Sequence, residues 1–182
     1  MKKLLFAICV PYLMIACTGK SSDVADELSP KPATEATSED GETDPDQYKD
    51  LAMPGVGGGI VKISDYVGKN KLVMVDFWAS WCGPCRQEMP AVVRTYTDFH
   101  EKGLEIVGVS FDTESDSWSR AVHEMKMSWP QMSDLKGWDS EGAVAYDVRA
   151  IPANVLIDQN GKIVAKDLRG EELYRTVEEL LK

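Results

Sequence analysis

Uninterrupted apolar runs alternate along this chain with more polar segments of helical composition. Residues 71–78 and 104–111 are apolar runs rich in β-branched and aromatic side chains, and they predict two buried strands. The segment between them, residues 82–102, has the composition of a helix and is followed by Gly103, a residue type that commonly ends helices. This order of strand, helix and strand is typical of α/β proteins.

The rest of the chain continues the alternation and closes with a hairpin. Gln159-Asn160-Gly161 lies between two short apolar runs and is a hairpin signal. Strands that alternate with helices and finish in a hairpin predict an α/β sandwich around a mixed sheet. Helices are expected over residues 113–127, 138–146 and 171–181, and shorter strands over residues 60–63, 153–158 and 163–166.

The first sixteen residues carry a targeting pattern. Lys2 and Lys3 precede an apolar stretch, residues 4–16, that is shorter than an ordinary membrane-spanning helix. The stretch ends in Ala16-Cys17, and a small residue just before a cysteine resembles the signal of bacterial lipoproteins. That resemblance implies a signal peptide over residues 1–16 and a lipid on Cys17, which becomes the mature N-terminus. The alternative is an ordinary secretory signal that leaves Cys17 as a free thiol.

A polar, acidic segment follows the signal. Residues 18–50 hold ten Asp or Glu against three Lys and almost no large apolar side chain. Such a segment cannot bury enough apolar surface to fold. We therefore expect residues 17–50 to be a lipid-anchored, disordered acidic linker and residues 51–182 to be the folded domain.

Charge and motif spacing exclude two classes of ligand. The chain has 30 acidic and 20 basic side chains, a net charge of -10, whereas nucleic-acid binding needs a basic face. Pro54 to Gly59 is glycine-rich but lacks the spacing and the following Lys-Ser/Thr of a phosphate-binding loop, which favours a flexible turn. We expect no nucleic-acid partner, and we expect a monomer.

The four cysteines have different expected fates. Cys9 leaves with the signal and Cys17 takes the lipid, so only Cys82 and Cys85 remain for the domain. Two thiols at this spacing on the first turn of a helix can close a small disulfide, and the helix N-terminus stabilises the thiolate of the first. Because so short a loop stabilises a fold little, the pair indicates redox chemistry.

A structural disulfide and half of a zinc site are the alternatives for this pair. Zinc needs four ligands, but the domain offers only His100 and His123 and no second cysteine pair. We therefore expect no metal and no cofactor. The two histidines are interpreted as solvated helix residues.

The residues around the cysteine pair resemble a known family. Asp76-Phe77-Trp78-Ala79-Ser80-Trp81-Cys82-Gly83-Pro84-Cys85, followed by Pro90, resembles the thioredoxin active site, and Ile151-Pro152 resembles the cis-proline that faces the disulfide there. The long connection over residues 105–149, the lipid-type signal and an N-terminal strand are similar to the TlpA/ResA branch of exported thioredoxin-like proteins. Over residues 51–182 this implies a thioredoxin-like three-layer sandwich, with a central mixed sheet flanked by helices, an N-terminal strand extension and a central insertion.

The resemblance also implies roles for individual residues. Cys82 is the expected nucleophile, partly exposed, and Cys85 the resolving cysteine that ends the mixed disulfide. Asp76 lies inside an apolar strand where burial raises its pKa, so it is a candidate proton acceptor for Cys85. Glu88 shares a helix face with Cys85, and the resemblance implies that it tunes the thiol pKa; an ordinary surface residue is the alternative.

Client binding is expected around the cysteines and the proline. A cis Pro152 would expose the main-chain amide of Ile151, which can pair with an extended substrate as an added strand does. The expected client-binding residues are Trp81, Gly83, Pro84, Ile151 and Pro152. The remaining tryptophans, Trp78, Trp118, Trp129 and Trp138, are interpreted as core or rim packing.

These expectations combine into a function. The resemblance implies a membrane-anchored oxidoreductase in the periplasm or another extracytoplasmic space. Gly83-Pro84 resembles reducing thioredoxins, so we expect reduction of client protein disulfides, with a membrane thiol reductant as electron donor. Apocytochrome c cysteines, another redox protein or oxidised surface proteins are candidate clients.

Three other activities are weighed against this one. A thiol oxidase or isomerase is the alternative within the same chemistry. A copper chaperone of related fold would carry a histidine shortly before the cis-proline, and residues 146–150 contain none. A peroxidase of the peroxiredoxin type would carry a Thr two residues before its cysteine; Ser80 stands at that offset, but Trp81 to Cys85 matches the thioredoxin branch.

Overall fold

A computed structural model describes residues 44–182 of this protein. The expected signal peptide, the lipidation site Cys17 and most of the expected linker therefore lie outside the described residues. Within residues 44–182, no helix combines the length and apolar character needed to cross a membrane.

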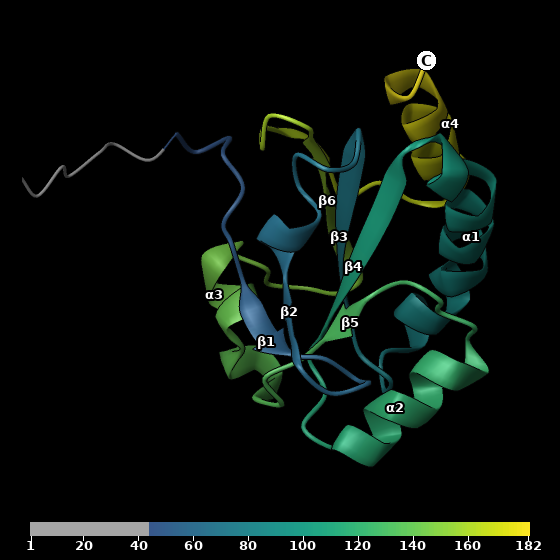
Figure 1. The fold of residues 1–182 in the computed structure, drawn as a ribbon. Helices are drawn as coiled ribbons and strands as arrows, with labels where there is room; N and C mark the ends of the chain where they lie inside the picture. The colour runs from purple at the N-terminus through teal and green to yellow at the C-terminus, as the bar shows by residue number, and fades with distance from the viewer. Residues whose placement is uncertain (1–43) are drawn as a thin grey trace, which may run out of the picture. The chain divides into compact units, whose positions relative to one another are not determined.

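A five-stranded mixed sheet forms the centre of the domain (Figure 1). Strand β3 lies in the middle, parallel to β4 and antiparallel to β6; β5 extends the sheet parallel to β4, and β7 pairs antiparallel with β6. Every residue of β3 and β4 is buried, which explains their uninterrupted apolar runs. The strands are β3 (Leu72–Trp78), β4 (Leu104–Ser110), β5 (Gln131–Met132), β6 (Ala153–Asp158) and β7 (Ile163–Lys166), in the order β5-β4-β3-β6-β7.

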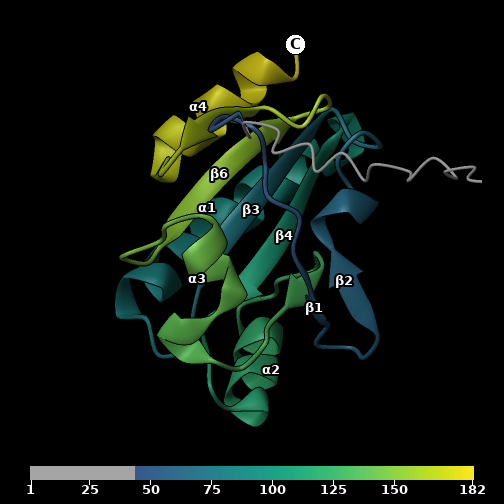
Figure 2. The ribbon, with the colours of Figure 1, turned by 90° about the vertical axis from the view of Figure 1, so that its left-hand side faces the viewer.

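Helices cover both faces of this sheet and give three layers, as predicted (Figures 1 and 2). Helices α1 (Gly83–Phe99) and α4 (Gly170–Leu180) pack against each other on one face. Helix α2 (Ser115–Glu124) lies beside α1, where Arg86 pairs with Glu124 at 3.7 Å. The opposite face carries α3 (Glu141–Ala145) and a two-stranded ribbon of β1 (Ala52–Pro54) and β2 (Ile60–Lys62). Short 3-10 turns occupy Ile63–Asp65, His100–Lys102 and Gly137–Asp139.

The glycine-rich segment after Pro54 is the tight turn that joins β1 to β2. The N–H of Gly58 donates to the carbonyl of Gly55 at 3.0 Å, and Gly58 and Gly59 have φ angles of 90° and 75°. Positive φ angles favour glycine because this residue has no Cβ to clash with the main chain. The segment is thus a turn, as predicted. Strand β2 lies within the strand predicted over residues 60–63, whereas β1 and β5 were not predicted.

Residues before Leu51, the expected start of the domain, already contact the folded part of the chain. The N–H of Ile163 donates to the carbonyl of Asp46 at 2.7 Å, and the N–H of Tyr48 donates to the carbonyl of Gly161 at 2.9 Å. A Cβ on Gly161 would lie 2.4 Å from the side chain of Gln47. The last residues of the expected linker therefore run along the β6–β7 hairpin.

Strand β3 places Asp76 and Trp78 on the face that α1 covers. Asp76 stands opposite Gly108 on β4 and Asn154 on β6. A Cβ on Gly108 would lie 2.1 Å from Oε1 of Gln131, so only glycine leaves room for this side chain. The same oxygen accepts a hydrogen bond from Nε1 of Trp78 at 3.1 Å. The absence of a side chain at Gly108 thus leaves room for Gln131, which holds Trp78 beneath α1.

Candidate active site

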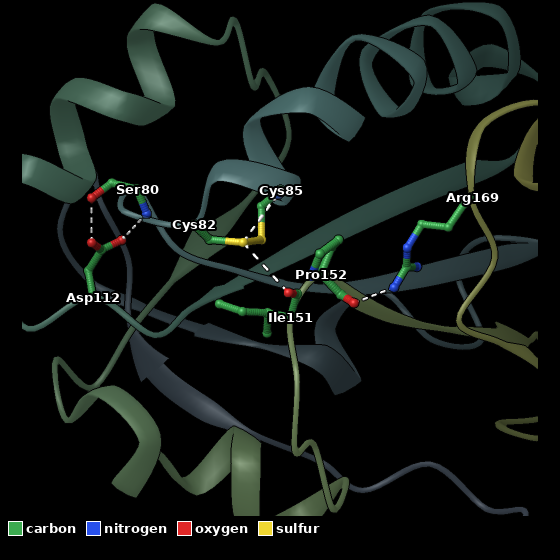
Figure 3. Close-up of a disulfide and its surroundings, with 7 residues drawn as sticks. All are labelled: Ser80, Cys82, Cys85, Asp112, Ile151, Pro152 and Arg169. Carbon is green, nitrogen blue, oxygen red and sulfur yellow. Dashed lines mark hydrogen bonds between the residues drawn. A yellow bond between two sulfur atoms is a disulfide. The ribbon is translucent and has the colours of Figure 1, made fainter.

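Cys82 and Cys85 form a disulfide at the N-terminus of α1 (Figure 3). Cys82 is the N-cap of this helix, and its sulfur accepts a hydrogen bond from the N–H of Cys85 at 3.1 Å. Cys82 exposes 5% of its surface and Cys85 only 1%, so the first cysteine is the more accessible. In this oxidised state Cys82 is less exposed than predicted, because the carbonyl oxygen of Ile151 lies 3.7 Å from its sulfur.

The loop before β6 faces the disulfide. The peptide bond between Ile151 and Pro152 is cis, and both residues are half-buried. The carbonyl oxygen of Pro152 accepts a hydrogen bond from Nη2 of Arg169, just before α4 (Figure 3). Nη1 of the same guanidinium donates to the carbonyl of Leu168 at 2.8 Å. Arg169, which the sequence analysis did not single out, therefore ties the proline loop to the start of α4.

Asp76 is buried beside Cys85. It lines a cleft with Cys85, Glu88 and Pro152 that is too narrow to admit a water molecule. Its Oδ2 has no hydrogen-bond partner among the described residues. Burial raises the pKa of Asp76 to about 7, although the positive charge of Arg169 lowers it and the carboxyl group of Glu88 raises it further. A carboxyl group with this pKa can both take and release a proton near neutral pH.

Glu88 is joined to a different helix rather than lying free on the surface of α1. Its Oε1 accepts a hydrogen bond from the main-chain N–H of Gly170 at 2.5 Å. Gly170 is the first residue of α4, so the carboxylate lies at the positive end of that helix. The structure therefore brings the side chains of Asp76, Cys85 and Glu88 to one cleft between β3, α1 and the start of α4.

A second buried carboxyl group fixes the segment that leads into Cys82. Asp112 exposes 1% of its surface and accepts hydrogen bonds from the main-chain N–H of Ser80 at 2.9 Å and its Oγ at 2.5 Å (Figure 3). It accepts a third from Oγ of Ser110 at 2.7 Å. Asp112 was not predicted; the available signal was an acid directly after the apolar run that forms β4.

Asn154 holds the loop that carries Arg169. Its Nδ2 donates to the carbonyl of Leu168 at 2.8 Å, its Oδ1 accepts from the N–H of Leu168 at 3.1 Å, and its carbonyl accepts from the N–H of Asp167 at 2.8 Å. Asn154 was not predicted either, although its amide side chain interrupts the apolar run of β6. Arg169 itself left no signal in the sequence.

The remaining expected client-binding residues surround Cys82. Trp81 is exposed, and so are Gly83 and Pro84 at the first turn of α1. No atom lies within 4 Å of a Cβ built on Gly83, so the surface there is open. In the described part of the chain, no three His, Cys, Asp or Glu side chains are placed together as metal ligands. The site is thus a disulfide, two carboxyl groups and an exposed rim.

Comparison with known proteins identifies the family. Residues 45–166 match the AhpC/TSA family, which is more than half of the chain. The chain belongs to the AhpC/TSA family. Within it, the thiol-disulfide oxidoreductase ResA of Bacillus thuringiensis is 32% identical over 125 residues, which are 69% of this chain and 69% of that protein. ResA of Oceanobacillus iheyensis is 34% identical over 123 residues, 68% of this chain and 62% of that protein.

Solved structures of thiol-disulfide oxidoreductases superpose on this domain. The thioredoxin domain of a thiol-disulfide oxidoreductase from Bacteroides vulgatus superposes with a TM-score of 0.70 at 37% identity, covering 75% of this chain and 96% of that one. A thiol-disulfide oxidoreductase from Bacteroides fragilis gives a TM-score of 0.69 at 30% identity, covering 74% and 98%. The predicted thioredoxin-like fold and relationship to ResA are confirmed, and the protein is a thiol-disulfide oxidoreductase.

Proposed function

We propose that this protein is a membrane-anchored, extracytoplasmic thiol-disulfide oxidoreductase that mainly reduces disulfides of client proteins. The observation that carries the proposal is the Cys82–Cys85 disulfide at the N-terminus of α1, with the proline loop facing it. The N-terminus of a helix favours negative charge, so the reduced Cys82 is favoured as a thiolate. Its greater accessibility makes it, rather than Cys85, the residue that meets the client.

The proposed reaction starts from the reduced pair. The Cys82 thiolate attacks one sulfur of the client disulfide, the client S–S bond breaks, and a mixed disulfide forms. Cys85 then attacks the Cys82 sulfur, which releases the second client sulfur and restores the Cys82–Cys85 bond. The client gains two electrons and the pair loses them; Cys85 gives up the proton of its thiol, and solvent protonates the client thiolates.

Asp76 and Glu88 supply the proton chemistry in this proposal. Cys85 must lose its proton before it attacks, and Asp76 lines the same narrow cleft with a pKa of about 7. Glu88 lines this cleft as well, so its charge acts on both Asp76 and the thiols. The client main chain lies along Ile151 and Pro152 and over Trp81, Gly83 and Pro84.

A protein that reduces disulfides outside the cytoplasm must itself be reduced again after each reaction. We propose a membrane dithiol reductant that transfers two electrons to the Cys82–Cys85 disulfide by the same exchange in reverse. We also propose a lipid on Cys17, which would hold the domain at the membrane where this donor lies. Replacing Cys17 by alanine is expected to abolish incorporation of labelled fatty acid, and unchanged labelling would contradict the anchor.

The equilibrium reduction potential of the Cys82–Cys85 pair tests the direction of the reaction. A glutathione or dithiothreitol titration of the full chain is expected to give a value near that of thioredoxin, about -270 mV. A value near -120 mV, that of a strong oxidant, would overturn the reductase proposal. Replacing Cys85 by serine is expected to trap the mixed disulfide with a client, whereas replacing Cys82 is expected to abolish the reaction.

A further inference from the structure

Two half-exposed tryptophans stand together beside the redox disulfide. Trp81, which directly precedes Cys82, exposes 55% of its surface, and Trp138, from the 3-10 turn before α3, exposes 47%. Their ring centroids are 6.4 Å apart, and the ring planes are inclined by 56°. We call this pair of rings the tryptophan notch.

One ring of the tryptophan notch is attached to the core. The ring of Trp138 packs 5.3 Å from that of Phe111, which is fully buried just after β4. The N–H of Phe111 donates to the carbonyl of Trp78 at 2.8 Å, at the end of the central strand β3. Trp138 was predicted to pack in the core or at its rim. One part of its ring packs against Phe111 at the rim of the core, and the other part is exposed to solvent.

The exposed part of each ring is unfavourable unless something covers it. Half of a tryptophan side chain is about 100 Å² of largely apolar surface. Contiguous exposed apolar surface marks interaction sites, and tryptophan is enriched among the residues that dominate binding interfaces. A client must bring its disulfide to Cys82, the residue next to Trp81, so the notch is continuous with the surface that the client covers.

We propose that the tryptophan notch binds a bulky apolar side chain of the client, placed close to the client's disulfide cysteine. This inference deepens the proposed reductase function and rests on it. An extended chain advances about 3.3 Å per residue. In the mixed disulfide, a client cysteine is bonded to Cys82, and Trp81 is the residue next to Cys82. A client side chain two residues from that cysteine is therefore within reach of the two tryptophan rings. The preferred clients are protein disulfides flanked by aromatic or large aliphatic residues.

Two disulfide-linked peptide substrates test the proposal with the full chain. They are identical except that the residues two positions before and after each cysteine are Trp in one and Ser in the other. The parent protein is expected to show a kcat/KM about tenfold higher for the Trp peptide, since one good apolar anchor is worth about that factor. Trp138→Ala is expected to reduce this ratio at least fivefold, and Trp138→Phe to retain most of it.

Controls separate this inference from the proposed function. Val164→Ala, an exposed apolar residue on β7 at the other edge of the sheet, is expected to keep the parental ratio. Trp138→Phe keeps a ring against Phe111, so a loss confined to Trp138→Ala with unaltered circular dichroism is not caused by misfolding. An unchanged peptide ratio in Trp138→Ala, or an equal loss with both peptides, would overturn the proposed notch. Failure of the parent protein to reduce even 2-hydroxyethyl disulfide would instead overturn the reductase function.

Discussion

Glu88 on α1 accepts a hydrogen bond from the main-chain N–H of Gly170, the first residue of α4, at 2.5 Å. This contact joins two residues that are 82 positions apart in the chain and places a carboxylate in the cleft beside Cys85. The residue is therefore both a structural tie and a charge next to the redox pair. The two roles can be separated by substitution.

Glu88→Gln keeps an oxygen that can accept from Gly170 but removes the charge. We expect the pH midpoint of thiol alkylation in the reduced protein to shift by more than about half a pH unit, because a nearby charge acts on the thiolate. Glu88→Ala is expected to show the same shift and to lose about 1–2 kcal/mol of unfolding free energy as well, since a helix N–H loses its acceptor. Coincident alkylation profiles of Glu88→Gln and the parent would contradict a role in the chemistry.

Asp76→Asn should change how stability depends on pH. Burial raises the pKa of Asp76 in the folded state, so the folded protein holds this proton more tightly than the unfolded chain does. The contribution of Asp76 to stability is therefore fully present below about pH 4 and is lost as the pH rises through about 7. The rise of the pKa from 3.8 to about 7 corresponds to at most ~4 kcal/mol.

Urea unfolding of the oxidised proteins at pH 4 and pH 8.5 measures this effect. From pH 4 to pH 8.5, the unfolding free energy of Asp76→Asn is expected to rise relative to that of the parent by ~2–4 kcal/mol. Asp139→Asn, which replaces an exposed acid, is the matched control and is expected to show no such gain. A parent and Asp76→Asn that change in parallel would mean that Asp76 titrates normally in the folded protein.

The same substitution should slow one step of catalysis selectively. Asp76 lines the cleft with Cys85, while Cys82 lies nearer the surface. We expect Asp76→Asn to slow resolution of the mixed disulfide by about tenfold or more, the size typical of general-base catalysis, and to alter the attack by Cys82 far less. Stopped-flow measurement of both steps checks this. Equal effects on the two rates would remove Asp76 from the role of proton acceptor.

Removing the charge of Arg169 should raise the pKa of Asp76 above about 7. Arg169 lowers this pKa through its positive charge, so Arg169→Gln removes a stabilising influence on the Asp76 carboxylate. A carbon-detected NMR titration of the Asp76 carboxyl group measures the shift. Arg169→Lys keeps the charge and is expected to stay closer to the parent, and Arg149→Gln, at an exposed ion pair with Asp147, is expected to leave it unaltered. A lowered pKa in Arg169→Gln would contradict the electrostatic role.

Asp112→Asn should loosen the segment that leads into Cys82. Asp112 accepts three hydrogen bonds from Ser80 and Ser110, and asparagine keeps only one accepting oxygen, so its NH₂ group leaves one or two of these donors without an acceptor. Leaving buried donors without an acceptor is expected to cost ~1–3 kcal/mol of unfolding free energy. Asp116→Asn, at an exposed acid on α2, is the control in the same urea experiment. A loss no larger than that of the control would mean that the Ser80 segment does not depend on Asp112.

The sequence by itself determined the features that depend on neighbouring residues. The apolar runs of β3 and β4, the helix that follows Cys82 and the hairpin at Gly161 are local patterns, and each was predicted. The position of Asp76 inside a buried strand was also visible, because a single acid interrupts an apolar run. The spacing of Cys82 and Cys85 then indicated redox chemistry before any fold was known.

Only the tertiary structure decided which distant residues complete the site. Glu88 meets Gly170 across 82 residues, Ser80 meets Asp112 across 32, and Pro152 meets Arg169 across 17. Trp81 and Trp138 likewise come together from different elements. These contacts follow from how α1, α4 and the loops after β4 and β7 pack on the sheet. A local pattern cannot report them, because a side chain's distant partner is set by packing and not by its neighbours in the chain.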